Sequence, residues 1–187
     1  MTTKTRYPRE QAHVVALRLK SELASSCEMI EIAGSLRRGR ADVGDIEFLC
    51  VPRTMPMRDL FGDEIGSHDL LTERCLFLED DGILKRRGGF GPQNKLLVDV
   101  ESGIPVDIFS TTLANWGMSL VVRTGPADFN VRLMSEFKRL GHKAHAYGGV
   151  TLNAYDIHGA RKEITCPTEE SVFEAIGWKW LEPEERR

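Results

Sequence analysis

Residues 34–47 read GSLRRGRADVGDIE, and this stretch decides the fold. It joins two apolar segments, 29–33 and 46–51, that have the length and composition of buried strands. Side chains in a strand alternate between faces, so Asp45 and Glu47 point the same way, roughly 7 Å apart along the chain. Two carboxylates in this arrangement suit a shared pair of divalent ions that also bind phosphate oxygens.

The residues upstream of the two acids favour a binding site over an ordinary polar turn. Asp45 and Glu47 alone are better explained as exposed acids of an edge strand. Gly34 and Ser35, however, end one strand with small side chains and free backbone N–H groups, which let a phosphate approach closely. Arg38 adds a delocalised charge matched to phosphate oxygens. These features occur together, and we therefore predict a phosphate site beside the acids.

A site of this kind needs a third carboxylate from a neighbouring strand. Residues 95–100 and 104–109 predict a β-hairpin, and each of its strands carries one acid. Asp107 has apolar residues on both sides, where an unpaired charge would be costly. Asp99 is the alternative ligand, but it is explained more simply as an ordinary acid on an exposed face of the hairpin. We choose Asp107 as the third ligand and as a general base toward a hydroxyl group.

Composition limits the class of protein. A chain of 187 residues that is 41% hydrophobic forms one domain, or two small domains that share an interface. Its four scattered cysteines contain no CxxC pair, which argues against a zinc knuckle or a disulfide framework. No apolar run approaches the roughly 20 residues that span a bilayer, and the N-terminus lacks a signal-peptide core. We expect a cytoplasmic protein without membrane contact, and a nuclear location also fits.

The net charge of −3 is unusual for a protein that grips nucleic acid, because phosphate contacts favour basic surfaces. Any such contact must come from local clusters. Three occur, at residues 37–40, 85–87 and 138–143. Each cluster taken singly is better explained as a solvated face.

The rest of the chain predicts an α+β fold, since strands and helices do not alternate regularly. The character of the sequence changes near residue 124, which divides the chain into 1–123 and 124–187. The other expected elements are, in chain order, a helix over 8–24, a loop over 52–70, a helix from about 67 to 79, a helix from Thr124-Gly125-Pro126 to Gly141, strand-like pieces around 147–149 and 157–159, and a helix over 169–176.

Four successive motifs resemble the signatures of family X DNA polymerases and occur in the same order. They are GSLRRG…VGDIE, PVDIF, RTGPADFN and FEAIGWKWLEPEERR, and they extend from about residue 30 to the end. The first is shared with nucleotidyltransferases at large, whereas the last two are narrower. The resemblance implies a nucleotidyltransferase palm, a mixed β-sheet with flanking helices, followed by a small C-terminal α+β subdomain. It implies the minimal form known from viruses, without the lyase and helix-hairpin-helix domains of larger members.

The resemblance also implies roles for individual residues. Two divalent ions, Mg²⁺ or Mn²⁺, are expected on Asp45, Glu47 and Asp107. The expected nucleotide contacts are Gly34, Ser35, Arg38 and Gly44 for the triphosphate, Thr124 and Gly125 for the sugar, and Asn130 for the minor-groove edge of the base. The expected DNA contacts are Lys85, Arg86, Arg87 and Lys95, although an exposed hairpin lysine explains Lys95 about equally well. Arg37 is expected to be structural and to pair with Glu169 or Glu170.

Several positions depart from the family pattern. Glu47 stands where the second carboxylate is usually Asp. Pro105 stands two residues before the third carboxylate, where a basic residue is common. Val122 and Arg123 replace the aromatic residues that usually precede Thr-Gly, so we expect altered discrimination of the sugar.

The expected function is therefore that of a DNA polymerase. It would add nucleotides from nucleoside triphosphates to a primer 3′ end by two-metal phosphoryl transfer, on primer–template or gapped DNA, in short gap-filling or repair synthesis. We expect a monomer from a bacterial, phage or viral source. The alternatives are a template-independent terminal transferase, a small-molecule nucleotidyltransferase of the antibiotic-modifying type, and a non-catalytic nucleic-acid-binding remnant. The small-molecule enzyme would not need the Thr-Gly helix, and the remnant predicts loss of a carboxylate.

Overall fold

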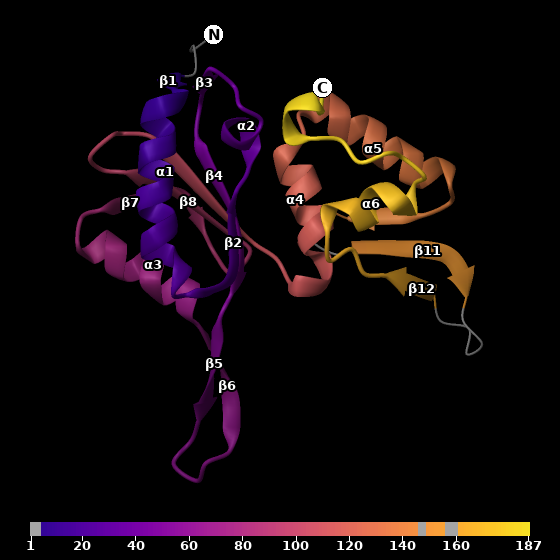
Figure 1. Ribbon diagram of the computed structural model, residues 1–187. Helices are drawn as coiled ribbons and strands as arrows, with labels where there is room; N and C mark the ends of the chain where they lie inside the picture. The colour runs from indigo at the N-terminus through magenta and orange to yellow at the C-terminus, as the bar shows by residue number, and fades with distance from the viewer. Residues whose placement is uncertain (1–4, 146–148, 156–160) are drawn as a thin grey trace.

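The computed structural model describes residues 5–145, 149–155 and 161–187. It confirms the predicted α+β fold: a mixed sheet with flanking helices is followed by a smaller unit of helices and a second sheet (Figure 1). No helix in the described ranges combines the length and the apolar character that crossing a membrane requires. The predicted division at residue 124 falls at the end of helix α4 (Trp116–Thr124).

The first unit is built on a five-stranded sheet. Its spatial order is β2 (Cys27–Ile32), β4 (Ile46–Pro52), β9 (Pro105–Ser110), β8 (Asn94–Asp99) and β7 (Leu84–Phe90). Only β4 and β9 are parallel, and the other neighbours are antiparallel. The parallel pair places the starts of β4 and β9 at the same edge of the sheet, which is where the predicted acids lie.

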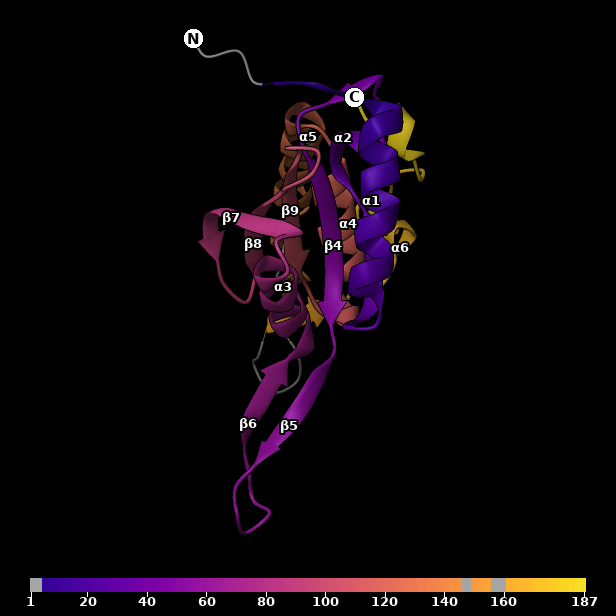
Figure 2. The ribbon, with the colours of Figure 1, turned by 90° about the vertical axis from the view of Figure 1, so that its left-hand side faces the viewer.

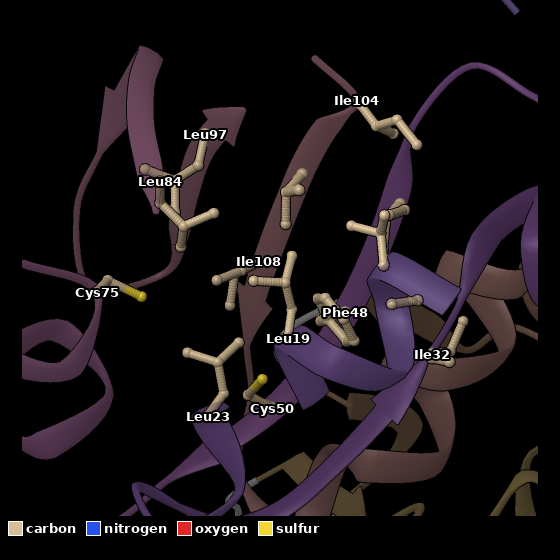
Figure 3. Close-up of a cluster of buried hydrophobic side chains, with 14 of the residues drawn as sticks. Leu19, Leu23, Ile32, Phe48, Cys50, Cys75, Leu84, Leu97, Ile104 and Ile108 are labelled. Atoms are coloured by element: carbon tan, nitrogen blue, oxygen red, sulfur yellow. The ribbon is translucent and has the colours of Figure 1, made fainter. Parts of the chain in front are cut away.

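One face of this sheet is covered by α1 (Arg9–Ala24) and α3 (Leu70–Asp80) (Figure 2). The apolar residues of α1 recur at helical spacing and are buried against inward-facing residues of the strands. Figure 3 shows Leu19 and Leu23 among side chains from the sheet, including Phe48 and Ile108. The alternation along β4 therefore leaves Glu47 on the opposite face.

Helix α4 joins the two units. Its Trp116 and Leu120 pack on Leu49 and Phe109, on the second face of the sheet. Other residues of α4 enter a separate core formed with α5 (Ala127–Arg139) and α6 (Glu169–Ala175). The remaining elements of the second unit are β10 (Lys143–His145), β11 (Gly149–Tyr155), β12 (Arg161–Ile164) and the 3-10 turn η2 (Pro183–Glu185).

Contact between α4 and the loop before α6 depends on one glycine. A Cβ atom on Gly117 would lie 1.9 Å from the carbonyl oxygen of Thr168, a distance that no side chain tolerates. The Gly117 N–H donates to the Cys166 carbonyl at 2.8 Å. Thr168 also caps α6, because its hydroxyl accepts from the Ser171 N–H at 3.2 Å. The start of α6, with Glu169, is thereby fixed against the helix that carries Thr124.

One expectation about secondary structure is wrong, and some elements were not expected. The segment 52–70 forms a hairpin, β5 (Thr54–Arg58) and β6 (Glu64–Asp69), that projects from the body of the first unit (Figures 1 and 2). Strand β7 was not expected either, and like the hairpin it lacks an apolar alternation because most of its residues are exposed. Helix α4 was also not expected, and Thr124, which was expected to open the next helix, ends α4. The pieces expected around 147–149 and 157–159 lie largely outside the described residues.

Candidate active site

The turn after β2 brings Gly34 against Glu47. Gly34 has a φ of +64°, and a Cβ atom there would lie 2.8 Å from the Glu47 carboxylate. Glycine is therefore required twice, for the backbone conformation and for the close approach. The chain continues into the short helix α2 (Gly34–Arg37), and the Arg38 N–H donates to the Gly34 carbonyl at 3.2 Å. This turn places Ser35 and Arg38 at the rim of the same pocket as Glu47.

The register between β4 and β9 brings two of the predicted acids together. Glu47 pairs directly with Asp107 in the parallel ladder, so both side chains lie on the same face of the sheet. Asp45 immediately precedes β4 and is close enough to Glu47 to affect its pKa. The three acids thus converge at one edge of the sheet, as the motifs predicted.

Asp99 lies on the other face of the sheet. Its side chain is fully buried, although the sequence favoured an acid on an exposed face of the hairpin. It accepts from Arg18 at 2.5 Å and from the Ser102 hydroxyl at 2.6 Å. Those contacts satisfy the carboxylate structurally and separate it from Glu47, which supports the choice of Asp107.

Glu47 is in an environment that disfavours its negative charge. Burial, together with the nearby Asp45 and Asp107 carboxylates, raises the pKa of Glu47 to about 7, against the opposing effect of Arg123 and Arg38. Carboxylate oxygens are the ligands that Mg²⁺ prefers. Throughout the described residues, no three acidic, imidazole or thiol groups are placed to hold an ion as the side chains stand. The donor types and the unfavourable negative charge nevertheless fit a divalent ion.

A pocket of about 320 Å³ adjoins Glu47. Both units contribute to it: Gly34, Ser35, Arg38 and Glu47 from the first, and Val122, Arg123, Gly125, Ala127 and Asn130 from the α4–α5 segment. Five of the predicted nucleotide contacts therefore lie around one cavity. A larger pocket of about 600 Å³, near Val51 and Thr111, contains none of the predicted residues. We assign function to the smaller one because the charged groups converge there.

The other two predicted nucleotide contacts do not line this pocket. Gly44 is buried and is not among the residues that line the pocket. Thr124 is fully buried, and its hydroxyl accepts from Arg37 at 2.9 Å while its carbonyl accepts from Arg38. The Thr124 side chain therefore binds Arg37 and does not line the pocket, while the Thr124 backbone carbonyl binds Arg38. Gly125 remains at the pocket wall.

Asn130 fixes the shape of the α4–α5 corner. Its amide donates to the carbonyls of Val122 at 2.8 Å and Gly125 at 3.2 Å. A Cβ atom on Gly125 would lie 2.6 Å from the Asn130 side-chain oxygen, so Gly125 has to be glycine. Arg123 lies over the Phe109 ring at 3.5 Å, which places a cation in the pocket near Glu47.

A buried carboxylate connects α2 to the C-terminal tail. Arg37 donates to both oxygens of Glu169, at 2.7 and 2.8 Å, which selects Glu169 over Glu170 as its partner. Arg186 is almost fully buried and donates to the same carboxylate at 2.6 Å. Burial opposes ionisation of Glu169, but the hydrogen bonds from Arg37 and Arg186 lower its pKa below the ordinary value. Sequence reasoning missed Arg186, since a terminal arginine gives no signal of burial.

The predicted DNA contacts have different surroundings. Lys85 is exposed. Arg86 pairs with Glu79 at 2.8 Å and lies over a phenylalanine ring. Arg87 pairs with Asp107. Each of these lies on β7, at the edge of the sheet.

Lys95 does not occupy a surface that DNA can reach. Its side chain is fully buried, and its ammonium group lies 3.2 Å from the Gly91 carbonyl and 3.8 Å from the Asp69 carboxylate. The alternation along β8 puts Lys95 on the same face as Leu97, under the helices. The expected DNA contact at Lys95 is therefore wrong in this structure.

Known proteins resemble this chain in sequence and in structure. A family model described as DNA polymerase beta thumb matches residues 119–187. DNA polymerase lambda of Rattus norvegicus is 26% identical over 197 aligned residues, which include 97% of this chain and 33% of that protein. The chain thus spans about a third of the length of this relative. A crystal structure of Leishmania infantum polymerase beta, a ternary P/T complex, superposes with a TM-score of 0.75 at 19% identity, covering 98% of this chain and 77% of that chain.

Proposed function

We propose that this chain, which is similar to DNA polymerase lambda in sequence and to polymerase beta in structure, transfers nucleotides from nucleoside triphosphates to the 3′ end of a DNA primer. The observation that carries this proposal is the pairing of Glu47 with Asp107 beside a pocket that Ser35 and Arg38 also line. Carboxylates that can bind divalent ions and hydrogen-bond donors that can bind phosphate groups therefore lie close together at one edge of the sheet. The expected context is gapped or primed DNA, in short repair synthesis.

The transfer forms a bond between the primer 3′-oxygen and the α-phosphorus, and it breaks the bond to the leaving pyrophosphate. Asp107 accepts the proton of the 3′-hydroxyl, directly or through water. Ser35 and Arg38 bind the phosphate oxygens of the incoming nucleotide. Divalent ions held by Asp45, Glu47 and Asp107 would supply positive charge for the attacking and leaving oxygens.

The second unit completes the nucleotide pocket in this proposal. Gly125 and Asn130 form a corner whose backbone is fixed by the Asn130 amide, which suits it to bind the sugar and base edge. The pairing of Arg37 with Glu169 and Thr124 holds this corner against α2. The phosphate site and the base site therefore keep a fixed separation.

Primer extension with and without a template strand tests the proposal. We expect addition of the nucleotide complementary to the template on a one-nucleotide gap, and little addition to the single strand. Equal addition of any nucleotide without a template would identify a terminal transferase. No addition to DNA under any of these conditions, with Mg²⁺ or Mn²⁺ present, would contradict the proposal.

We expect Arg38→Ala to raise the KM for the nucleotide by about 10- to 100-fold, because charged hydrogen bonds contribute about 1.5–3 kcal/mol. Arg38 lines the pocket and is the predicted phosphate donor. Steady-state kinetics on saturating primed DNA measures the change. Arg139→Ala, which removes an exposed arginine paired with Glu136 on α5, serves as the control. A rise in the Kd for DNA with an unchanged nucleotide KM would contradict the assignment.

We also expect measurable incorporation of ribonucleotides. Val122 and Arg123 line the pocket in place of aromatic side chains, and Arg123 can donate to a hydroxyl instead of excluding it. Single-nucleotide insertion with matched deoxy- and ribonucleotides, compared by kcat/KM, measures the preference. A deoxy preference above about a thousandfold, roughly 4 kcal/mol, would show that the backbone alone forms an effective barrier.

A further inference from the structure

Strand β7 is irregular at the point where it passes the candidate site. Arg86 pairs with Leu97 on β8, but the next aligned residue, Phe90, pairs with Lys95. Residues 87–89 therefore stand opposite the single residue Leu96. A Cβ atom on Gly88 would lie 3.2 Å from the Leu96 side chain, so a glycine there lets the bulged strand lie close to β8. Bulges of this kind redirect side chains, and they are common next to active sites.

The bulge gives two consecutive arginines different partners. Arg86 turns toward α3, where it pairs with Glu79 at 2.8 Å. Arg87 crosses β8 in the other direction. Its Nε donates to the Leu97 carbonyl at 2.9 Å, and its terminal nitrogen donates to the Asp107 carboxylate on β9.

The position of Arg87 is set from two sides. The Leu97 carbonyl binds Nε of the guanidinium, and Asp107 binds a terminal nitrogen of the same group. The guanidinium therefore cannot rotate without losing a hydrogen bond. The Asp107 side chain is 14% exposed and that of Arg87 is 35% exposed, which leaves the pair partly shielded from solvent. Arg87 does not line the nucleotide pocket. Among the three predicted acids, the one that Arg87 contacts is Asp107.

We propose that Arg87 is a positioning residue for Asp107, and that the guanidinium competes with divalent ions for the Asp107 carboxylate. Arg87 orients the acid and partly neutralises the three converging carboxylates while no ion is bound. Its positive charge also opposes the arrival of an ion. The effect on catalysis rests on the proposed function, whereas the effect on ion binding does not.

Ion binding without nucleotide or DNA is the first test. Titration of the protein with Mn²⁺, followed by electron paramagnetic resonance, should show tighter binding by Arg87→Ala than by wild type, by about threefold or more for the loss of one nearby charge. Arg87→Lys, which keeps the charge, should bind as wild type does. Lys85→Ala removes the same charge two residues earlier in β7 and should leave the Mn²⁺ affinity unchanged. Equal affinities of Arg87→Ala and wild type would overturn the competition.

Unfolding in urea with a chelator tests the contact itself. Arg87→Ala should lower the unfolding midpoint more in the wild-type protein than in Asp107→Asn, because the hydrogen bond to the Leu97 carbonyl is lost in both backgrounds but the ion pair only in the first. The same loss in both backgrounds would mean that Arg87 acts only through other contacts, which would overturn the proposal.

Kinetics tests the positioning role. Arg87→Ala should lower kcat by about 10- to 100-fold, as loss of partners of metal-binding carboxylates commonly does, with little change in the nucleotide KM. Arg87→Lys should recover part of kcat. An unchanged kcat with weaker DNA binding would overturn the role and make Arg87 a phosphate contact. If wild type itself shows no nucleotide addition, the proposed function fails while the Mn²⁺ and unfolding results still decide whether Arg87 contacts Asp107.

Discussion

Glu47→Gln is expected to abolish nucleotide addition and, in the absence of divalent ions, to stabilise the protein above neutral pH. The amide removes a ligand, which should reduce the rate by about a thousandfold or more, because several kcal/mol of transition-state charge stabilisation depend on the bound ions. The same change removes a partly buried charge that Asp45 and Asp107 repel. Activity and stability should thus change in opposite directions.

The pH dependence of this stabilisation has a definite sign. The folded-state pKa of Glu47 is about 7, above its ordinary value of 4.5, so folding favours the protonated form. Wild type should therefore lose stability as pH rises from about 4.5 to about 7, by up to about 3 kcal/mol. Glu47→Gln does not titrate, and its advantage should be absent at low pH and complete at pH 8.

Thermal unfolding with a chelator, at pH 5.5 and pH 8, measures this difference. Mn²⁺ should then raise the Tm of wild type at pH 8 but have little effect on Glu47→Gln. Asp45→Asn and Asp107→Asn should also lose activity and the response to Mn²⁺. Asp80→Asn, which changes an exposed acid at the end of α3, is the control. Substantial activity in Asp107→Asn would show that the third ligand lies elsewhere.

Prediction from the sequence succeeded where one local rule determined the outcome. The apolar flanks of Asp107 favoured it over Asp99 as the third acid, and the register of the parallel pair places Asp107 directly beside Glu47. Helices α1 and α6 were also found to within one residue at each end, whereas α4 was not expected. These features depend only on which face of an element is buried.

Prediction failed where the burial and the contacts of a polar side chain depend on residues far away in the chain. Lys95 and Asp99 both lie on the buried face of β8, which the motifs did not reveal. Asp99 is neutralised by Arg18, 81 residues away in the chain. Thr124 looked like a pocket residue, but its partner is Arg37. Such pairings are set by packing between elements, and a local pattern contains no information about them.

Glu169→Ala is expected to be the most destabilising single change in the second unit. The Glu169 carboxylate binds Arg37 and Arg186, which join α2 of the first unit to the C-terminal tail. Its removal leaves Arg186, whose side chain is 0% exposed, without its acidic partner. Breaking a buried ion pair from one side costs about 3–5 kcal/mol, because the remaining charge stays desolvated.

Urea unfolding of Glu169→Ala and of Glu170→Ala provides a matched comparison, because the neighbouring Glu170 is exposed. Glu170→Ala should change the free energy of unfolding by less than about 0.5 kcal/mol. The pKa of Glu169 is lowered in the folded protein, so its contribution should be complete above pH 5 and should decline as pH falls through that lowered pKa. Because Arg37 adjoins Arg38, Glu169→Ala should also raise the nucleotide KM. Similar small losses in both variants would mean that Arg37 and Arg186 find other partners, and that the tail is held mainly by its apolar contacts.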